Sequence, residues 1–172
     1  MDLTSTSYIA AQIFGLISMV IAITSQQFKQ RNAVLISLAI ANAFNAAHFL
    51  LLGAITGLAL ACIGAIRFWV ATISTKTYWL VIFLTINTIA TYIVFETALL
   101  SGTSYIAATF VIASSFLKND NHMRIFLIIG TIGWLLYGIL VGSIIAIIAN
   151  SVFLGSGIIG WYRYNNKKYG SN

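Results

Sequence analysis

The chain is divided into seven apolar stretches, each long enough to cross a lipid bilayer as an α-helix. They lie near residues 8–25, 33–52, 54–74, 78–96, 99–117, 123–141 and 143–163. A spanning helix needs about 20 mostly apolar residues, with a range of about 17 to 25. The other structure that can span a membrane is a closed β-barrel, whose strands alternate apolar and polar residues. Continuous apolar runs such as 79–94 do not alternate, so the sequence predicts an all-α integral membrane protein.

The composition excludes a soluble protein. Of the 172 residues, 60% are hydrophobic and 7% are charged, whereas soluble domains carry about 25% charged residues. In a soluble protein the net charge of +6 would suggest a nucleic-acid partner. Here the basic residues fall mainly between the apolar stretches and at the C-terminal end. We therefore expect a single membrane domain whose partner is the lipid bilayer, and no nucleic acid.

The positions of the basic residues predict the orientation of the chain in the membrane. If the seven stretches alternate in direction, eight Lys and Arg residues border connections on one face: Lys29, Arg31, Lys76, Lys118, Arg124, Arg163, Lys167 and Lys168. The opposite face carries no Lys or Arg, and its charged residues are Asp2 and Glu96. Because cytoplasmic loops are enriched in Lys and Arg, we expect the N-terminus outside and the C-terminus in the cytoplasm.

A shift of 89 positions superposes features of the two halves of the chain. The matching pairs are Gly53 with Gly142 (142 − 53 = 89), Lys29 with Lys118, and His48 with Tyr137. The shift corresponds to four crossings, which preserves orientation, so the repeats are parallel. The sequence thus predicts two three-helix repeats joined by a linker helix, in a 3+1+3 layout. Repeat one covers about 8–74, the linker helix about 78–96 and repeat two about 99–163.

This layout is that of SWEET-type transporters, which bind substrate at the repeat interface near the bilayer midplane. The chain also resembles the YgjV-type family of bacterial inner membrane proteins. The resemblance is carried by His48-Phe49-Leu50-Leu51-Leu52-Gly53 followed by Arg67, and by Gly142-Ser143-Ile144 followed by Trp161-Tyr162-Arg163. It covers nearly the whole chain. It implies a bacterial inner-membrane location and a fold similar to SWEET and PQ-loop transporters, and says less about the substrate.

Two features depart from the PQ-loop pattern. The Pro-Gln pair near the cytoplasmic end of the first helix of each repeat is replaced by Ser25-Gln26 and Ser114-Ser115. In addition, the chain contains no proline. Proline kinks are common hinges, because the ring removes one backbone hydrogen bond and clashes with the preceding turn. Rocking of the repeats is therefore expected to bend at glycines or to move whole helices.

Arg67 is the most informative polar residue. It lies about 13 positions into the third apolar stretch, and an arginine at the bilayer centre costs roughly 2.5–3.5 kcal/mol on insertion scales. It either faces a central cavity and holds an anionic or hydroxyl-rich substrate, or extends its side chain to the cytoplasmic interface. That interface lies seven residues further on, at Ser74 (74 − 67), or ~10 Å along the helix. Structural hydrogen bonding is a third alternative.

Three more candidates lie in the second apolar stretch. Asn42, Asn45 and His48 recur every third residue, which predicts a polar stripe on one helix face. The stripe either lines a solvated pathway or forms hydrogen bonds between helices, which are worth ~0.6 kcal/mol on average in bilayers. For His48 the alternatives are a proton relay and a packing residue.

The second repeat supplies the remaining candidates. SWEET-like transporters bind sugars through an asparagine on the last helix of each repeat, and Asn150 resembles that position. Its counterpart in repeat one is Ala61 (150 − 89), which weakens the match. Trp134 and Tyr137 lie one turn apart and either stack on a sugar ring or base, or fill the core.

The sequence lacks the residue sets that catalysis or metal binding would need. There is no carboxylate pair within the apolar stretches, no Cys/His cluster and no plausible nucleophile–base–acid set. We therefore expect no enzymatic activity, no cofactor and no metal. The sequence predicts a small-solute transporter or facilitator for a polar solute such as a sugar or sugar acid, held between the two helix triplets. The alternative is a non-transporting membrane protein that binds a partner or senses a ligand. Assembly as a homo-oligomer stays open.

Overall fold

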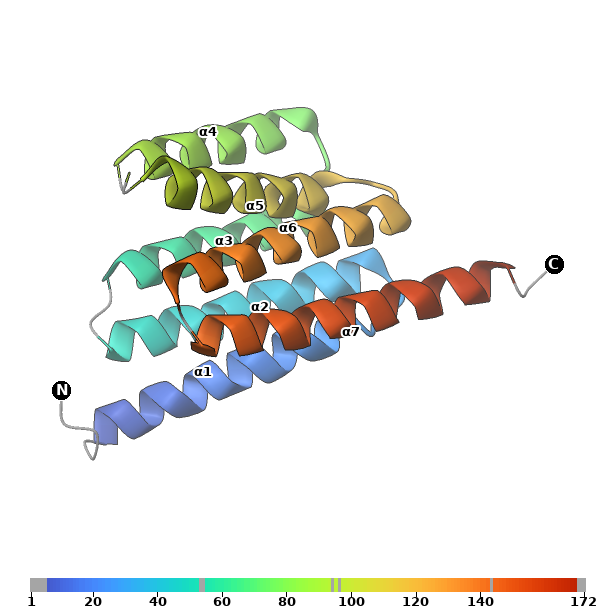
Figure 1. Cartoon of the computed structure of the whole chain (residues 1–172). Helices are drawn as coiled ribbons and strands as arrows, with labels where there is room; N and C mark the ends of the chain where they lie inside the picture. The colour runs from blue at the N-terminus through green and yellow to red at the C-terminus, as the bar shows by residue number, and fades with distance from the viewer. Residues whose placement is uncertain (1–5, 53–54, 94, 96, 143, 170–172) are drawn as a thin grey trace.

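The protein is built of α-helices throughout the part that the computed structural model describes, which is residues 6–52, 55–93, 95, 97–142 and 144–169. Seven helices lie in these ranges (Figure 1). They are α1 (Thr6–Ser25), α2 (Arg31–Leu51), α3 (Ile55–Ile73), α4 (Thr77–Ile93), α5 (Ala98–Phe116), α6 (Asp120–Val141) and α7 (Ile144–Tyr169). Each coincides with one predicted stretch to within a few residues, which confirms the helices. Gly53, Asp2 and Glu96 lie outside the described residues.

Local capping explains where several helices begin and end. Thr97 precedes α5 and its side chain accepts a hydrogen bond from the backbone N–H of Leu100. Asn119 does the same for two N–H groups at the start of α6, where Asp120 also suits the positive end of the helix dipole. The last turn of α6 is closed by Gly142, whose φ of 72° lies in the left-handed region that glycine tolerates best.

The helices pack as two groups of three. In the first triplet, α2 packs between α1 and α3, and in the second triplet α6 packs between α5 and α7. Two further contacts join the triplets, the α1–α7 seam and the α3–α5 seam, while α4 packs against α5. The shift of 89 relates α1 to α5 and α3 to α7, so the two seams are counterparts. The SWEET-like interpretation of this arrangement stays a prediction.

The outer surface of the helices suits a bilayer. Large apolar side chains such as Leu60, Trp69, Ile86 and Ile106 are exposed. Within the described residues, four helices are long and apolar enough to cross a membrane: Thr6–Ser25, Arg31–Leu51, Ala98–Phe116 and Asp120–Leu140. The segments Leu60–Ile73 and Thr77–Ile93 are shorter apolar helices. The structure therefore supports a polytopic membrane protein, and seven full crossings remain a prediction.

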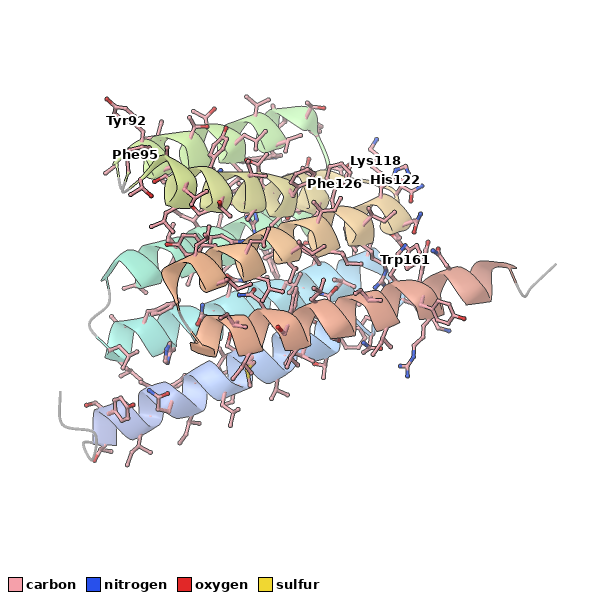
Figure 2. The ribbon with its side chains drawn as sticks, viewed as in Figure 1. Tyr92, Phe95, Lys118, His122, Phe126 and Trp161 are labelled. Atoms are coloured by element: carbon pink, nitrogen blue, oxygen red, sulfur yellow. The ribbon has the colours of Figure 1, made fainter. Side chains whose placement is uncertain are left out.

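The two ends of the bundle differ. Figure 2 shows Lys118, His122 and Trp161 together at one end, with Tyr92 and Phe95 at the other. We call the first of these the basic end. The main hydrophobic core also lies in the half of the bundle nearest this end, because its members come from the C-terminal halves of α3 and α5 and the N-terminal parts of α2 and α6. Examples are Val34, Leu35, Phe68, Ala71, Ile112, Phe116, Met123 and Leu127.

Candidate functional site

Arg124 ties the second triplet to the first at the basic end. It lies in the second turn of α6 and is 1% exposed. Its Nη1 donates to the carbonyl oxygen of Gln26 at 3.0 Å, and its Nη2 donates to the carbonyl oxygens of Phe28 and, at 3.4 Å, Lys29. The guanidinium carbon lies 5.2 Å from the ring centre of Tyr164. Backbone oxygens of the α1–α2 connection thus take the place of water at Nη1 and Nη2, while Nε is buried without a hydrogen-bond partner among the described residues.

Arg31 makes the opposite connection. It is the first residue of α2. Its Nε donates to the carbonyl oxygen of Leu117 at 2.7 Å, and its Nη2 donates to the carbonyl oxygen of Ser115. These oxygens end α5, and Nη1 also donates to the carbonyl oxygen of Ala71 in α3 at 3.1 Å. One guanidinium therefore bridges the α3–α5 seam.

The acceptors of the two arginines are related by the sequence repeat. Ser115 follows Gln26 by 89 positions (115 − 26), and Leu117 follows Phe28 by 89 (117 − 28). Each triplet thus donates hydrogen bonds from one arginine to the same two carbonyl positions of the other triplet. We call the hydrogen bonds of Arg31 and Arg124 the arginine ties. The arginines themselves are 93 positions apart (124 − 31), so the shift of 89 does not pair them. In the sequence, both arginines border apolar stretches, a pattern that predicts only the orientation of the chain.

The helix ends that the ties hold have matching geometry. Ser25 donates from Oγ to the carbonyl oxygen of Ala22 at 2.6 Å. Ser114 donates to the carbonyl oxygen of Val111 at 2.7 Å, and both pairs are related by 89 positions (114 − 25 and 111 − 22). These serines stand where the PQ-loop pattern has proline. Their bonds to the preceding turn are of a kind that often bends helices.

Side chains also close the α1–α7 seam. Ser156 on α7 donates from Oγ to the carbonyl oxygen of Ile23 at 2.7 Å. Gln27 donates from Nε2 to Oγ and to the backbone oxygen of Ser156, both at 2.9 Å. Arg163 donates to Oε1 of Gln27 at 3.0 Å. This seam is therefore bridged by hydrogen bonds near the basic end.

Arg67, the leading candidate from the sequence, has a different environment. Its Nε is buried and has no hydrogen-bond partner in the described part of the chain, and its guanidinium carbon lies 4.4 Å from the ring centre of Phe68. The other three arginines all donate to oxygen atoms, although the Nε of Arg124 is also buried without a partner among the described residues. Ile63 and Val70, four residues before and three after, lie on the same side of α3 and pack against the core. Arg67 thus combines a charge with incomplete hydrogen bonding.

The stripe on α2 does not occupy one face as the sequence suggested. Asn42 faces α3, since a Cβ added at Gly64 would lie 2.5 Å from its Oδ1. His48 faces α1, where its Nδ1 lies 2.7 Å from the carbonyl oxygen of Ala11. Asn45 is half-buried between them. Three residues are less than one turn of 3.6, so six residues rotate the side chain by about 120°. Two of the three candidates therefore contact neighbouring helices.

The candidates of the second triplet are less defined. The rings of Trp134 and Tyr137 lie 5.7 Å apart, edge to face, and both residues are half-buried on α6. Asn150 is half-buried on α7 and makes a polar or ring contact of its own. Its counterpart Ala61 is buried. The two aromatic rings of α6 thus contact each other, and their role stays a prediction.

Across the described ranges, no group of three or more His, Cys, Asp or Glu side chains could hold a metal ion. Cys62 is a free, exposed thiol. The charged groups that gather at helix ends are instead arginines bonded to carbonyl oxygens.

Comparison with known proteins identifies the family of the chain but no individual related protein. No curated protein and no solved structure matches the chain. A family model for bacterial inner membrane proteins, Imp-YgjV, matches residues 9–168. The match covers most of the chain and agrees with its apolar helices, so the chain belongs to the Imp-YgjV family of bacterial inner membrane proteins.

Proposed function

We propose that the protein is a carrier that moves a small polar solute across the bacterial inner membrane. The solute is held between the first triplet (α1–α3) and the second triplet (α5–α7), and α4 links the two in a 3+1+3 layout. Transporters built from parallel repeats bind substrate at the repeat interface and move one repeat against the other.

The arginine ties are the observation that carries this proposal. Arg124 and Arg31 each hold the carbonyl oxygens that end the first helix of the opposite triplet. Such reciprocal contacts favour two similar bodies that meet along two seams. These contacts are hydrogen bonds, which can break and form again, so the triplets can separate at this place and close again. Rocking about the interface then exposes the solute site to one side of the membrane at a time.

The packing supports a state closed at the basic end. The largest buried side chains of the core, including Leu35 and Met123, lie in the same half of the bundle as the arginine ties. The bonds of Gln27 and Ser156 across the α1–α7 seam add to this closure. With the basic end in the cytoplasm, as the positive-inside rule predicts, this packing suits a carrier closed on its cytoplasmic side.

The alternative is a membrane protein that binds a partner or senses a ligand without transport. The contacts of Asn42 and His48 favour it, because both side chains contact neighbouring helices in place of lining a pathway. In that case the triplets stay closed, and the ties are permanent parts of the structure.

Uptake into proteoliposomes tests the proposal. The purified protein would be reconstituted and offered labelled sugars, sugar acids, amino acids and inorganic anions. For a carrier we expect saturable uptake of at least one solute above that of empty vesicles. In Gln27→Cys/Ser156→Cys on a Cys62→Ser background, a thiol cross-linker should stop the uptake, whereas either single cysteine should keep it. Specific binding of a panel member without uptake would instead establish the sensing alternative.

A further inference from the structure

Arg67 lies at the position on α3 that corresponds, by the repeat, to a polar residue closing the opposite seam. The shift of 89 relates it to Ser156 (67 + 89), and the α3–α5 and α1–α7 seams are counterparts. Ser156 bonds across its seam to the carbonyl oxygen of Ile23 and to the side chain of Gln27. The counterpart position on α3 therefore faces the α3–α5 seam, which is where Arg67 belongs by the repeat.

The partners available at the two seams differ. The counterparts of Ile23 and Gln27 on α5 are Ile112 (23 + 89) and Phe116 (27 + 89). Phe116 is buried and stacks on Phe83 with ring centres 5.8 Å apart. The position that holds the amide of Gln27 at one seam thus holds the aromatic ring of Phe116 at the other. At the α3–α5 seam, the position that corresponds to Gln27 therefore holds an apolar side chain and offers Arg67 no side-chain oxygen atom.

The position of Arg67 along α3 prevents full escape to water at the basic end. The helix ends at Ile73, six residues further on (73 − 67), which is about 9 Å. One turn toward that end, the carbonyl oxygen of Ala71 is already taken by Arg31. The side chain instead lies over the ring of Phe68 at 4.4 Å, and its Nε is buried without a partner among the described residues. This is a costly arrangement for a charge in a membrane.

We propose that Arg67 is the binding group for an oxyanion, a carboxylate or phosphate, carried by the transported solute. The guanidinium fork matches two oxygens of such a group, and its charge makes these hydrogen bonds stronger than neutral ones. The buried ring of Phe68, over which the guanidinium lies, excludes water from the contact, which strengthens it further. This inference rests on the carrier function proposed above and narrows the solute to an organic or inorganic anion.

The test is anion binding to the purified full-length protein in a nonionic detergent, followed by thermal unfolding. The probes are sodium phosphate, sodium sulfate, gluconate and glucose 6-phosphate, with glucose as the neutral match and sodium chloride as the ionic-strength match. We expect at least one oxyanion to raise the midpoint of unfolding, and glucose and chloride to leave it unchanged. No shift with any oxyanion, or an equal shift with glucose, would overturn the proposal.

Substitutions then assign the shift to Arg67. In Arg67→Gln the half-saturating concentration of the anion should rise at least about tenfold. Arg67→Lys retains the charge but loses the fork, so its half-saturating concentration should lie between the two, which also keeps the test open if Arg67→Gln does not fold. Ile66→Ala is the matched control, because Ile66 is 57% exposed on the outer surface of α3, and it should bind the anion as the unsubstituted protein does. An unchanged shift in Arg67→Gln would refute the assignment.

Two further measurements, lipid stabilisation and solute uptake, test the anion inference separately from the carrier function. Stabilisation by phosphatidylglycerol, with none by soluble oxyanions, would refute an anionic solute and identify a lipid headgroup as the occupant. Saturable uptake of a neutral sugar that Arg67→Gln does not change would refute the anion inference and leave the carrier function standing. Binding of an oxyanion through Arg67 without uptake would support the inference and count against transport.

Discussion

The guanidinium of Arg124 lies 3.0 Å from the carbonyl oxygen of Gln26, a residue 98 positions earlier in the chain. Gln26 directly follows the last residue of α1 and Arg124 lies in the second turn of α6, so this contact joins the two triplets directly. Because Arg124 is also buried, its charge depends on the carbonyl oxygens of the α1–α2 connection for hydrogen bonds. Removing either side leaves polar groups without partners.

Replacing Arg124 with alanine should therefore destabilise the protein. Hydrogen bonds to charged groups contribute about 1.5–3 kcal/mol, and the abandoned carbonyl oxygens add to the loss. We expect the free energy of unfolding to fall by about 2–4 kcal/mol, measured by denaturant titration in mixed micelles. Arg163→Ala is the matched control, because Arg163 is exposed and donates to one side-chain oxygen. It should cost less than about 1 kcal/mol, and equal losses would show that the tie carries no special weight.

Gly160 should tolerate no side chain. A Cβ added there would overlap the carbonyl oxygen of Gln26, the same oxygen that Arg124 bonds. Gly160→Ala should thus push α7 away from the α1–α2 connection and cost about 1–3 kcal/mol of unfolding free energy. Gly155 lies on the same helix, and nothing lies within 4 Å of an added Cβ. Gly155→Ala should be neutral or stabilising by up to ~1 kcal/mol. Equal effects of the two substitutions on unfolding in micelles would contradict this close approach.

His48 should act as a packing residue. Its Nδ1 lies 2.7 Å from the carbonyl oxygen of Ala11, and a carbonyl oxygen only accepts, so Nδ1 carries the proton. His48→Ala should lower the unfolding free energy by about 1 kcal/mol, the usual range for a hydrogen bond between membrane helices. Solute uptake, measured in proteoliposomes at equal protein density, should persist. Loss of uptake in a variant of unchanged stability would restore the proton-relay alternative.

The periodicity and charge of the sequence predicted a large part of this fold. All seven helices and the grouping of basic residues at one end follow from runs of apolar residues that are longer than any loop. The individual contacts did not follow. At a spacing of three residues, Asn42 and His48 look like one stripe, yet they face α3 and α1. The sequence gives their angular separation around α2, but the helices that each side chain contacts depend on the packing of α1 and α3.

The arginine ties show a second limit. In the sequence, Arg31 and Arg124 are basic residues beside apolar stretches, a pattern that topology alone explains. Their separation of 93 differs from the repeat of 89 by one helical turn, so no alignment of the two halves pairs them. The pairing exists between their acceptors, and backbone oxygens carry no sequence signal. Only the hydrogen bonds of Arg31 on α2 and Arg124 on α6 to the opposite triplet reveal it.

Thiol labelling would establish whether Arg67 faces water or lipid. On a Cys62→Ser background, Arg67→Cys should react with a membrane-impermeant, water-soluble thiol reagent in reconstituted vesicles, because a solute site between the triplets must be wet in at least one state. Ile66→Cys is the matched control. Ile66 is 57% exposed on the outer surface of α3, where the bilayer protects a thiol from such reagents.

The outcome discriminates between the alternatives for this residue. If Arg67 only extends along the lipid surface toward the cytoplasm, cysteine at 67 lies as deep in lipid as cysteine at 66, and neither reacts. If it lines the α3–α5 seam, cysteine at 67 reacts alone, and a bound oxyanion should no longer slow the reaction, since its binding group is gone. Labelling of Val70→Cys in the presence of Arg67 provides the complement. It should proceed without anion and slow as the anion saturates its site.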